Sequence, residues 1–355
     1  MNILWLTWRD IKNPEAGGAE KVAIEVASRL VKDQIPVTLF SSHFANAKNQ
    51  ENVRGVKIVR RGGLITCRLF AFLYYIRRTN EFDLIIDEIN TIPFLTPLWA
   101  KNKSITIIYQ LAKEYWFKKI IWPLNIVGYL LESLMLSIYK NQKVLTLSSS
   151  TMNDLYKFKF SDVNIFPTGT DHKGKIPTIK KPLIIFLGRL TKAKNPEDAI
   201  KAFKFIYSKL PVYQLYIIGR GKDTYVKYLR NLASSLNLSN KIHFLGFVSD
   251  KEKIRLLKEA KLILIPSIRE GWGLVVNEAN ATGCVPIGYD IAGLKDSIKN
   301  NVTGLLVKSR PDSLAQAALK VLRNDKLRKK LIQNGFKLSQ QYSWEKTYQD
   351  FKAFL

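Results

Sequence analysis

Cations and carboxylates follow short apolar runs at several places in the sequence. Arg189 and Lys194 lie in the segment GRLTKAKN, directly after the apolar run PLIIFLG. Two cations in one loop can neutralise a diphosphate. Glu270 and Glu278 lie on either side of a Gly-Trp-Gly turn in EGWGLVVNE, and ionised carboxylates accept hydrogen bonds from hydroxyl groups. Together these residue types indicate a site for a sugar joined to a nucleoside diphosphate.

The turn between the two glutamates precedes an expected helix whose first amides could hold a phosphate. Trp272 lies between Gly271 and Gly273, and a helix is expected to begin around Leu274. Backbone amides at a helix N-terminus can hold a phosphate, because they point outward at the positive end of the helix dipole. A general acid/base pair is the alternative role for the two glutamates, although ionised carboxylates beside cations fit better as hydrogen-bond acceptors.

A second pair of glycines lies near the start of the chain. Gly17 and Gly18 open a helix expected over residues 18–31. Glycine has no side chain, so an anion can approach such a helix end closely. The segment does not match GxGxxG, and the dinucleotide-binding fingerprint is therefore absent.

Two further glycines follow expected strands. Gly188 permits a tight exit from PLIIFLG, and Gly246, Phe247 and Val248 follow the run KIHFLG. An aromatic edge and backbone groups at that position could hold a planar base.

Short apolar runs alternate with helical patterns along both halves of the chain. This alternation predicts parallel sheets with helices on both faces. Residues 166–182 interrupt the alternation and are rich in Pro, Gly, Thr and Lys, which indicates an interdomain linker between two α/β domains. Ligands of such sheets bind outside the carboxyl ends of the strands, where the residues named above are expected to lie.

The chain resembles a family 4 retaining glycosyltransferase of the glycosyl transferases group 1. Four motifs carry the resemblance in the family's order: GGAE (17–20), GRLTKAKN (188–195), FLGFVSD (244–250) and EGWGLVVNE (270–278). The resemblance implies the GT-B fold, α/β with two Rossmann-like doubly wound parallel-sheet domains facing across a cleft. We expect an acceptor-binding domain at 1–172, a nucleotide-sugar-binding domain at 173–340, and a C-terminal helix at 341–355 that packs back on the first domain.

The resemblance also implies a role for each motif. Arg189 and Lys194, with the amides of Gly273 and Leu274, would neutralise the diphosphate. Glu278 would bind the ribose, Glu270 would hold the transferred sugar, and Gly18 would approach the phosphate or the sugar. The complete expected set for the sugar nucleotide is Gly17, Gly18, Gly188, Arg189, Lys194, Gly246, Phe247, Val248, Glu270, Gly271, Trp272, Gly273, Leu274 and Glu278.

Tyr109 occupies the position at which many relatives carry a histidine. Tyrosine donates a hydrogen bond but cannot repeat the acid/base behaviour of histidine. The expected catalytic residues are thus Glu270, Arg189, Lys194 and Tyr109. The resemblance further implies transfer with retention of configuration, no cofactor besides the sugar nucleotide, and no metal, because the cations replace it.

The chain is strongly basic, with 56 Lys and Arg against 29 Asp and Glu and a net charge of +27. This charge favours anionic partners, which leaves nucleic acid, anionic lipid and phosphorylated small molecules open. A lysine-rich solvated surface is the simpler explanation. A nucleic-acid-binding protein, a DNA-directed glucosyltransferase, a sugar-nucleotide epimerase and a protein that binds the sugar nucleotide with weak or no turnover remain alternatives to the glycosyltransferase.

Two segments of the first half combine apolar, aromatic and basic residues. They are residues 64–78 and the stretch after residue 112, which interleaves Tyr115, Trp116, Phe117 and Trp122 with Lys113, Lys118 and Lys119. Such a composition suits a bilayer interface, so we expect a lipid-linked acceptor or an anionic membrane surface as partner.

Two other features indicate where the protein resides. A membrane-spanning helix over 120–139 is rejected, because the segment contains Pro123, Asn125 and Glu132. The N-terminus lacks a signal-peptide pattern, and the two cysteines lack disulfide or zinc spacing. We expect a cytoplasmic protein, peripheral at the inner face of the membrane.

Overall fold

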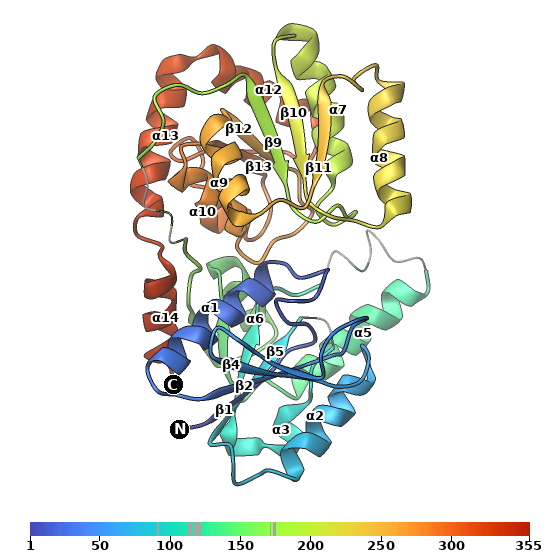
Figure 1. Ribbon diagram of the computed structural model, residues 1–355, viewed down its shortest axis with the longest axis vertical. Helices are drawn as coiled ribbons and strands as arrows, with labels where there is room; N and C mark the ends of the chain where they lie inside the picture. The colour runs from blue at the N-terminus through green and yellow to red at the C-terminus, as the bar shows by residue number, and fades with distance from the viewer. Residues whose placement is uncertain (91, 113–115, 117–121, 171, 173–174) are drawn as a thin grey trace. The chain divides into compact units, whose positions relative to one another are not determined.

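The computed structural model describes residues 1–90, 92–112, 116, 122–170, 172 and 175–355. The chain divides into two compact units (Figure 1). Unit 1 contains Met1–Thr168 and Trp344–Leu355, and unit 2 contains Gly169–Ser343. Residues 171, 173 and 174, next to the expected domain boundary, lie outside the described residues.

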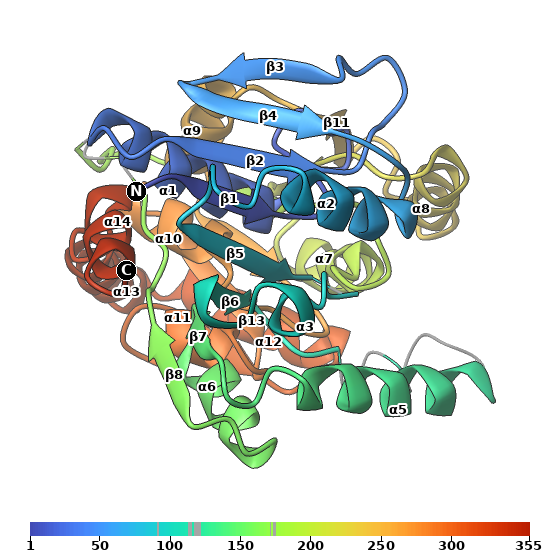
Figure 2. The same ribbon diagram turned by 90° about the horizontal axis from the view of Figure 1, so that it is seen from below.

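Unit 1 is built on an eight-stranded sheet of order β3-β4-β2-β1-β5-β6-β7-β8, which Figure 2 shows from β3 at the top to β8 at the bottom. All neighbours are parallel except β3 and β4. The order changes direction at β1, which lies between β2 and β5. The strands are β1 (Ile3–Leu6), β2 (Val37–Ser41), β3 (Gln50–Val53), β4 (Val56–Arg60), β5 (Leu84–Ile89), β6 (Ser104–Ile108), β7 (Lys143–Thr146) and β8 (Asp162–Ile165).

The antiparallel edge is a local hairpin, which the alternation pattern did not indicate. Arg54 and Gly55 connect β3 to β4 and have φ of 56° and 88°. Two consecutive residues with positive φ form the tight turns that match the twist of a hairpin. The short polar strand β3 therefore closes one edge of an otherwise parallel sheet.

Helices cover the strands of unit 1, whose central runs are buried. Apolar strands of this kind are typical of parallel sheets with helices on both faces. The helical segments are α1 (Gly18–Lys32), α2 (Thr66–Ile76), α3 (Thr96–Trp99), η1 (Lys101–Lys103), α5 (Leu124–Ser137), α6 (Ser149–Lys157) and α14 (Trp344–Lys352).

The last helix of the chain belongs to the core of unit 1. The Phe351 ring stacks on Trp5 with 5.5 Å between ring centroids and lies 5.7 Å from the ring of Phe166. The Tyr348 hydroxyl donates to Asp33 at the end of α1 over 2.5 Å. Helix α14 therefore joins the amino-terminal strand and helix to the end of β8.

Unit 2 has a six-stranded sheet of order β11-β10-β9-β12-β13-β14, and all its neighbours are parallel. The chain moves outward from β9 to β11 and then returns to the other side of β9 with β12. Ligands of doubly wound sheets bind at such a reversal, outside the carboxyl ends of the strands. The strands are β9 (Leu183–Leu187), β10 (Gln214–Ile218), β11 (Ile242–Gly246), β12 (Leu262–Ile265), β13 (Val285–Tyr289) and β14 (Leu305–Val307).

Residues of β9 alternate between the two faces of this sheet. Ile184 and Phe186 pack into one hydrophobic cluster with α7, α8, α12 and α13, whereas Leu183 and Ile185 pack into another with α9, α10 and α11. The helices are α7 (Pro196–Lys209), α8 (Asp223–Ser235), α9 (Asp250–Glu259), α10 (Leu274–Ala281), α11 (Leu294–Ser297), α12 (Pro311–Arg323) and α13 (Asp325–Ser339). Cys67 in unit 1 and Cys284 in unit 2 are buried free thiols, as their spacing predicted.

Candidate functional site

The structure brings Lys194 and Glu270 together where β9 and β12 end. The Lys194 Nζ donates to the Glu270 Oε1 over 2.5 Å, and the Ser267 hydroxyl donates to the same oxygen over 2.7 Å. The two loops are also tied by their backbones, since the Ile268 N–H donates to the Ala193 carbonyl over 2.9 Å. A cation and a carboxylate from separate loops thus meet at the reversal point of the sheet.

Both charges of this pair have hydrogen-bonding capacity beyond their mutual contact. Glu270 is only 7% exposed, and a carboxylate with two oxygens accepts about four hydrogen bonds. The ammonium of Lys194 has three donors, of which Glu270 uses one. The pair can therefore hold a phosphate oxygen and a sugar hydroxyl at adjacent positions.

Gly188 and Arg189 form the exit from β9. The Leu190 N–H donates to the Arg220 carbonyl over 2.7 Å, so the loops after β9 and β10 run side by side. A Cβ at Gly219 would lie 1.8 Å from the Gly188 carbonyl oxygen, and only glycine permits this approach. Arg189 is exposed on this tightly packed edge.

The loop after β11 carries Gly246, Phe247 and Val248. The Gly246 carbonyl accepts from the Gly219 N–H over 2.8 Å, and Val248 is half-buried. Phe247 is 67% exposed, and the Arg220 guanidinium carbon lies 4.5 Å from its ring centroid. One face of the ring expected to hold a base therefore contacts a cation, an attraction typical of arginine over aromatic rings.

Helix α10 begins at Leu274, directly after the Gly271-Trp272-Gly273 turn. Gly273 has φ of 89°, a conformation that glycine adopts readily and other residues adopt at a cost. Trp272 is buried and meets Tyr342 edge to face, with 5.3 Å between ring centroids. The turn is thus fixed by packing, and the amides of the first turn of α10 lie close in sequence to Glu270.

Glu278 lies on α10 and pairs with Lys253 of α9. The Lys253 Nζ is 2.7 Å from the Glu278 Oε1 and 2.8 Å from an oxygen of Asp250. Burial disfavours the ammonium form, but the carboxylates of Glu278 and Asp250 outweigh burial and raise the pKa of Lys253. Lys253 was not among the predicted residues, although it lies three residues after the motif FLGFVSD.

The remaining expected residues belong to unit 1. Gly18 is the first residue of α1, and the Gly17 N–H donates to the Glu20 Oε2 over 2.7 Å. This amide is therefore bound by its own helix, because Glu20 caps the N-terminus. Tyr109 follows β6 and is 5% exposed.

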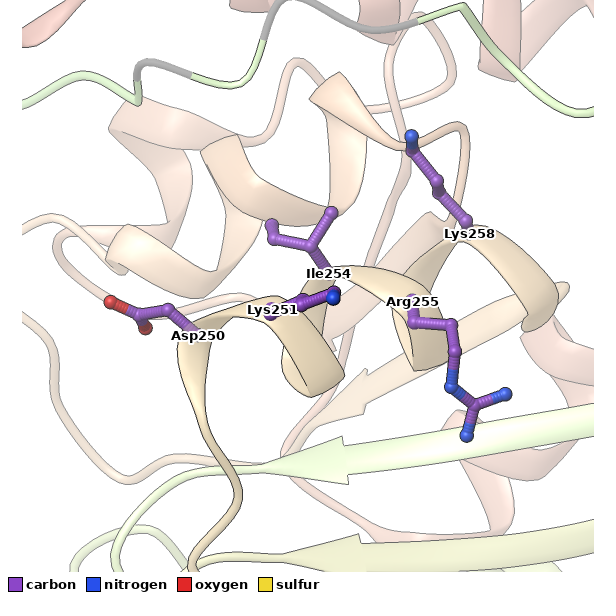
Figure 3. A pocket seen from close by; sticks show the side chains of 5 residues that line it. All are labelled: Asp250, Lys251, Ile254, Arg255 and Lys258. Carbon is purple, nitrogen blue, oxygen red and sulfur yellow. The ribbon is translucent and has the colours of Figure 1, made fainter.

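Two cavities lie elsewhere, and none of the expected site residues lines them. One of about 490 Å³ is lined by Asp250, Lys251, Ile254, Arg255 and Lys258 of α9 (Figure 3). Figure 3 shows the Arg255 and Lys258 side chains pointing in different directions. The other, of about 360 Å³ in unit 1, is lined by His43, Asn49, Gln50, Arg60, Arg61, Gly62 and Phe70.

Known proteins resemble both the sequence and the structure. An uncharacterized glycosyltransferase of Methanocaldococcus jannaschii is 33% identical over 165 residues, which are 46% of this chain and 42% of that protein. The sucrose-phosphate synthase of Thermosynechococcus elongatus has a TM-score of 0.84 at 18% identity, covering 99% of this chain and 97% of the other. The structure of Anabaena HepE in complex with UDP and glucose has a TM-score of 0.78 at 17% identity, covering 99% of this chain and 98% of the HepE chain.

These likenesses confirm the expected fold class, two parallel-sheet α/β domains as in GT-B glycosyltransferases. The aligned part spans less than half the length of the first curated relative. The model of the family described as glycosyl transferases group 1 matches residues 169–338, nearly all of unit 2. These residues, which include the Lys194–Glu270 pair, are thus similar to the glycosyl transferases group 1 family.

Proposed function

We propose that the chain is a retaining glycosyltransferase that moves a sugar from a nucleoside-diphosphate sugar to an acceptor bound by unit 1. The contact between Lys194 and Glu270 at the ends of β9 and β12 carries this proposal. It supplies a cation for the diphosphate and a carboxylate for the sugar at the place where ligands of doubly wound sheets bind. The HepE structure, solved with UDP and glucose, supports this class of substrate.

Each side chain has a task in the proposed reaction. Arg189 and Lys194, with the amides of Gly273 and Leu274, hold the diphosphate, Glu278 binds the ribose, and Glu270 holds the sugar. The bond from the anomeric carbon to the phosphate oxygen breaks, and the acceptor oxygen bonds to that carbon on the same face. The leaving phosphate takes the acceptor's proton. Fixed cations stabilise the leaving diphosphate, so the reaction needs no divalent metal.

A panel of nucleoside diphosphates tests this proposal by thermal unfolding. One of them is expected to raise the melting temperature, because a ligand at ten times its Kd stabilises the folded chain by about 1.4 kcal/mol. Glu278→Gln is expected to weaken this effect, since it removes the charged acceptor for the ribose. Glu81→Gln, on the surface of unit 1, is the control. If no nucleoside diphosphate stabilises the unaltered chain, the proposed function is wrong.

We also propose that unit 1 associates with an anionic membrane surface. Helices α2 and α5 expose apolar side chains, and Figures 1 and 2 both show α5 projecting from its unit. Arg61, Arg77 and Arg78 near the ends of α2 supply positive charge for anionic lipid. The exposed side chains in or directly before α2 include Ile65, Leu69, Phe70 and Ile76. Those in or shortly before α5 are Trp122, Ile126, Val127, Leu130, Leu131 and Leu134.

The expected membrane segment continues into the residues between 112 and 122. Lys113, Tyr115, Phe117, Lys118 and Lys119 lie outside the described residues. Among the residues that the structure does describe, no helix combines the length and the apolar character needed to cross a bilayer.

Flotation with anionic vesicles at low salt tests the membrane proposal. The unaltered chain is expected to float with the vesicles. The double variant Leu130→Glu, Leu134→Glu is expected to bind them with an affinity lower by about tenfold or more for each leucine, because burying a leucine contributes about 1.5–3 kcal/mol. Val212→Glu, at an exposed apolar position of unit 2, is the matched control. Equal flotation of the double variant and the unaltered chain would remove these helices as the docking face.

A further inference from the structure

A lysine occupies an inward position of α9 that the helical pattern would give to an apolar residue. Leu256, Leu257 and Ala260 follow Lys253 at spacings of three, four and seven residues, and all three are buried. Residues at these spacings share one face of a helix. The Lys253 side chain therefore continues the buried stripe of α9, and it is only 13% exposed.

This position is unfavourable for a positive charge in two ways. Burial disfavours an ammonium group, and Lys253 lies near the amino-terminal end of α9, where the helix dipole is positive. Two carboxylates offset both effects, because the Lys253 Nζ lies 2.7 Å from the Glu278 Oε1 and 2.8 Å from an oxygen of Asp250. The lysine therefore depends on these carboxylates at this position.

Net stability does not explain why the contact with Glu278 is buried. Replacing a buried ion pair by well-packed apolar residues is often neutral or stabilising, and α9 and α10 already share an apolar cluster. The Asp250 side chain is 79% exposed, so solvent screens its charge, whereas the Glu278 side chain is only 11% exposed. The contact between Lys253 and Glu278 is therefore better explained by what the carboxylate does.

The ion pair lies beside the loop that is expected to hold the base. Val248 of that loop packs against the hydrophobic cluster of α9 and α10. Ser249, the next residue, caps α9, because its hydroxyl accepts from the Glu252 N–H over 3.2 Å. The loop, the start of α9 and the contact to α10 are thus held in one packed region of unit 2.

A fixed ammonium restricts where the Glu278 carboxylate can lie. A glutamate side chain has several rotamers, and the hydrogen bond from Lys253 to the Oε1 selects among them. An acceptor that is already oriented binds a hydroxyl without a further loss of side-chain freedom. Hydrogen bonds from a hydroxyl to a charged carboxylate are also stronger than those to a neutral acceptor.

We propose that Lys253 is a positioning residue that orients the Glu278 carboxylate toward the ribose, so that the site selects ribonucleotides over 2′-deoxyribonucleotides. The inference rests on the proposed function, in which Glu278 binds the ribose. It adds α9 to the site through a residue that acts on a carboxylate and not on the nucleotide itself.

Isothermal titration with ADP, GDP, CDP and UDP, each beside its 2′-deoxy form, tests this role. The unaltered chain is expected to bind its preferred ribonucleotide about tenfold more tightly than the deoxy form, the usual effect of one hydrogen bond to a charged group. Lys253→Met is expected to reduce this ratio to within about twofold, because the carboxylate is no longer held in place. Lys251→Met, which removes an exposed lysine from the same helix, is the matched control and is expected to keep the ratio.

The deoxynucleotide distinguishes a positioning role from general damage to unit 2. Lys253→Met is expected to weaken binding of the ribonucleotide about tenfold and binding of the deoxy form by less than about twofold, since the latter lacks the hydroxyl that an oriented carboxylate accepts. A variant with a damaged site would instead bind both ligands more weakly and keep their ratio at about tenfold.

A double variant tests whether Lys253 acts through Glu278. In a Glu278→Gln background, Lys253→Met is expected to change neither affinity by more than about twofold, because no charged acceptor remains to be oriented. The double variant buries no unpaired carboxylate, so it carries the test if Lys253→Met alone does not fold. If the double variant binds the ribonucleotide more weakly than Glu278→Gln does, Lys253 acts on the nucleotide itself and the positioning role is wrong.

The outcomes separate this inference from the proposed function. An unaltered chain that binds a ribonucleotide and its deoxy form equally, or a Lys253→Met variant that keeps the full ratio, overturns the positioning role and leaves the proposed function standing. If none of the ribonucleotides binds the unaltered chain, the proposed function is wrong and the inference falls with it.

Discussion

Lys194→Ala is expected to lower kcat/KM by about 10²–10³-fold, the usual cost of removing one preorganised group that stabilises developing charge. The substitution removes a cation from the leaving diphosphate and takes away the ion-pair partner of Glu270, which is only 7% exposed. Steady-state kinetics with the sugar nucleotide identified by the panel measures the effect.

Two companion variants make the Lys194 experiment specific. Lys192→Ala removes a charge from an exposed position in the same loop and is expected to change kcat/KM by less than about twofold, since the carboxylate of Glu270 is paired with Lys194. Lys194→Arg keeps the positive charge but spreads it over a planar guanidinium. Its kcat/KM is expected to lie between those of Lys192→Ala and Lys194→Ala, because arginine does not reproduce the point charge of lysine. Equal activity of Lys192→Ala and Lys194→Ala would contradict the proposed site.

Phe351→Ala is expected to destabilise unit 1 by about 3–5 kcal/mol, the range for truncating a buried phenylalanine. The ring is fully buried between Trp5 and Phe166, so its loss leaves a cavity under the central strand of the sheet. Urea unfolding with separate reporters on the two units is expected to show an earlier transition for unit 1, while the transition of unit 2 stays in place.

The matched control for Phe351 is Phe205→Ala. Phe205 lies on α7 of unit 2 and is exposed, and such surface substitutions usually change stability by less than about 0.5 kcal/mol. If Phe351→Ala shifts the unfolding transition of unit 2 to lower urea, or shifts the transition of neither unit, α14 does not stabilise unit 1 as its contacts indicate.

Sequence patterns located the start of one helix of unit 2. A helix was expected to begin around Leu274, and α10 begins at this residue, because a glycine in a left-handed conformation ends the preceding turn and an apolar stretch follows. The hairpin of β3 and β4 was missed, since its short polar strand at the sheet edge lacks the apolar run by which the parallel strands were found.

Contacts between residues far apart in the sequence were harder to predict. Lys194 and Glu270 are 76 residues apart, and their contact depends on β12 pairing with β9, a strand order that no local pattern encodes. Lys253 was overlooked for a related reason. It is an ordinary charged residue in its own segment, and only the fold places it beside Glu278.

The position of α14 also decides when unit 1 can finish folding during translation. The ribosome makes β1 before unit 2 and the residues from Trp344 after it, yet Phe351 of α14 stacks on Trp5 of β1. Unit 2, whose residues are all made in between, can complete its core earlier. A stop codon between unit 2 and α14 would therefore harm unit 1 more than unit 2, although unit 2 is made just before it.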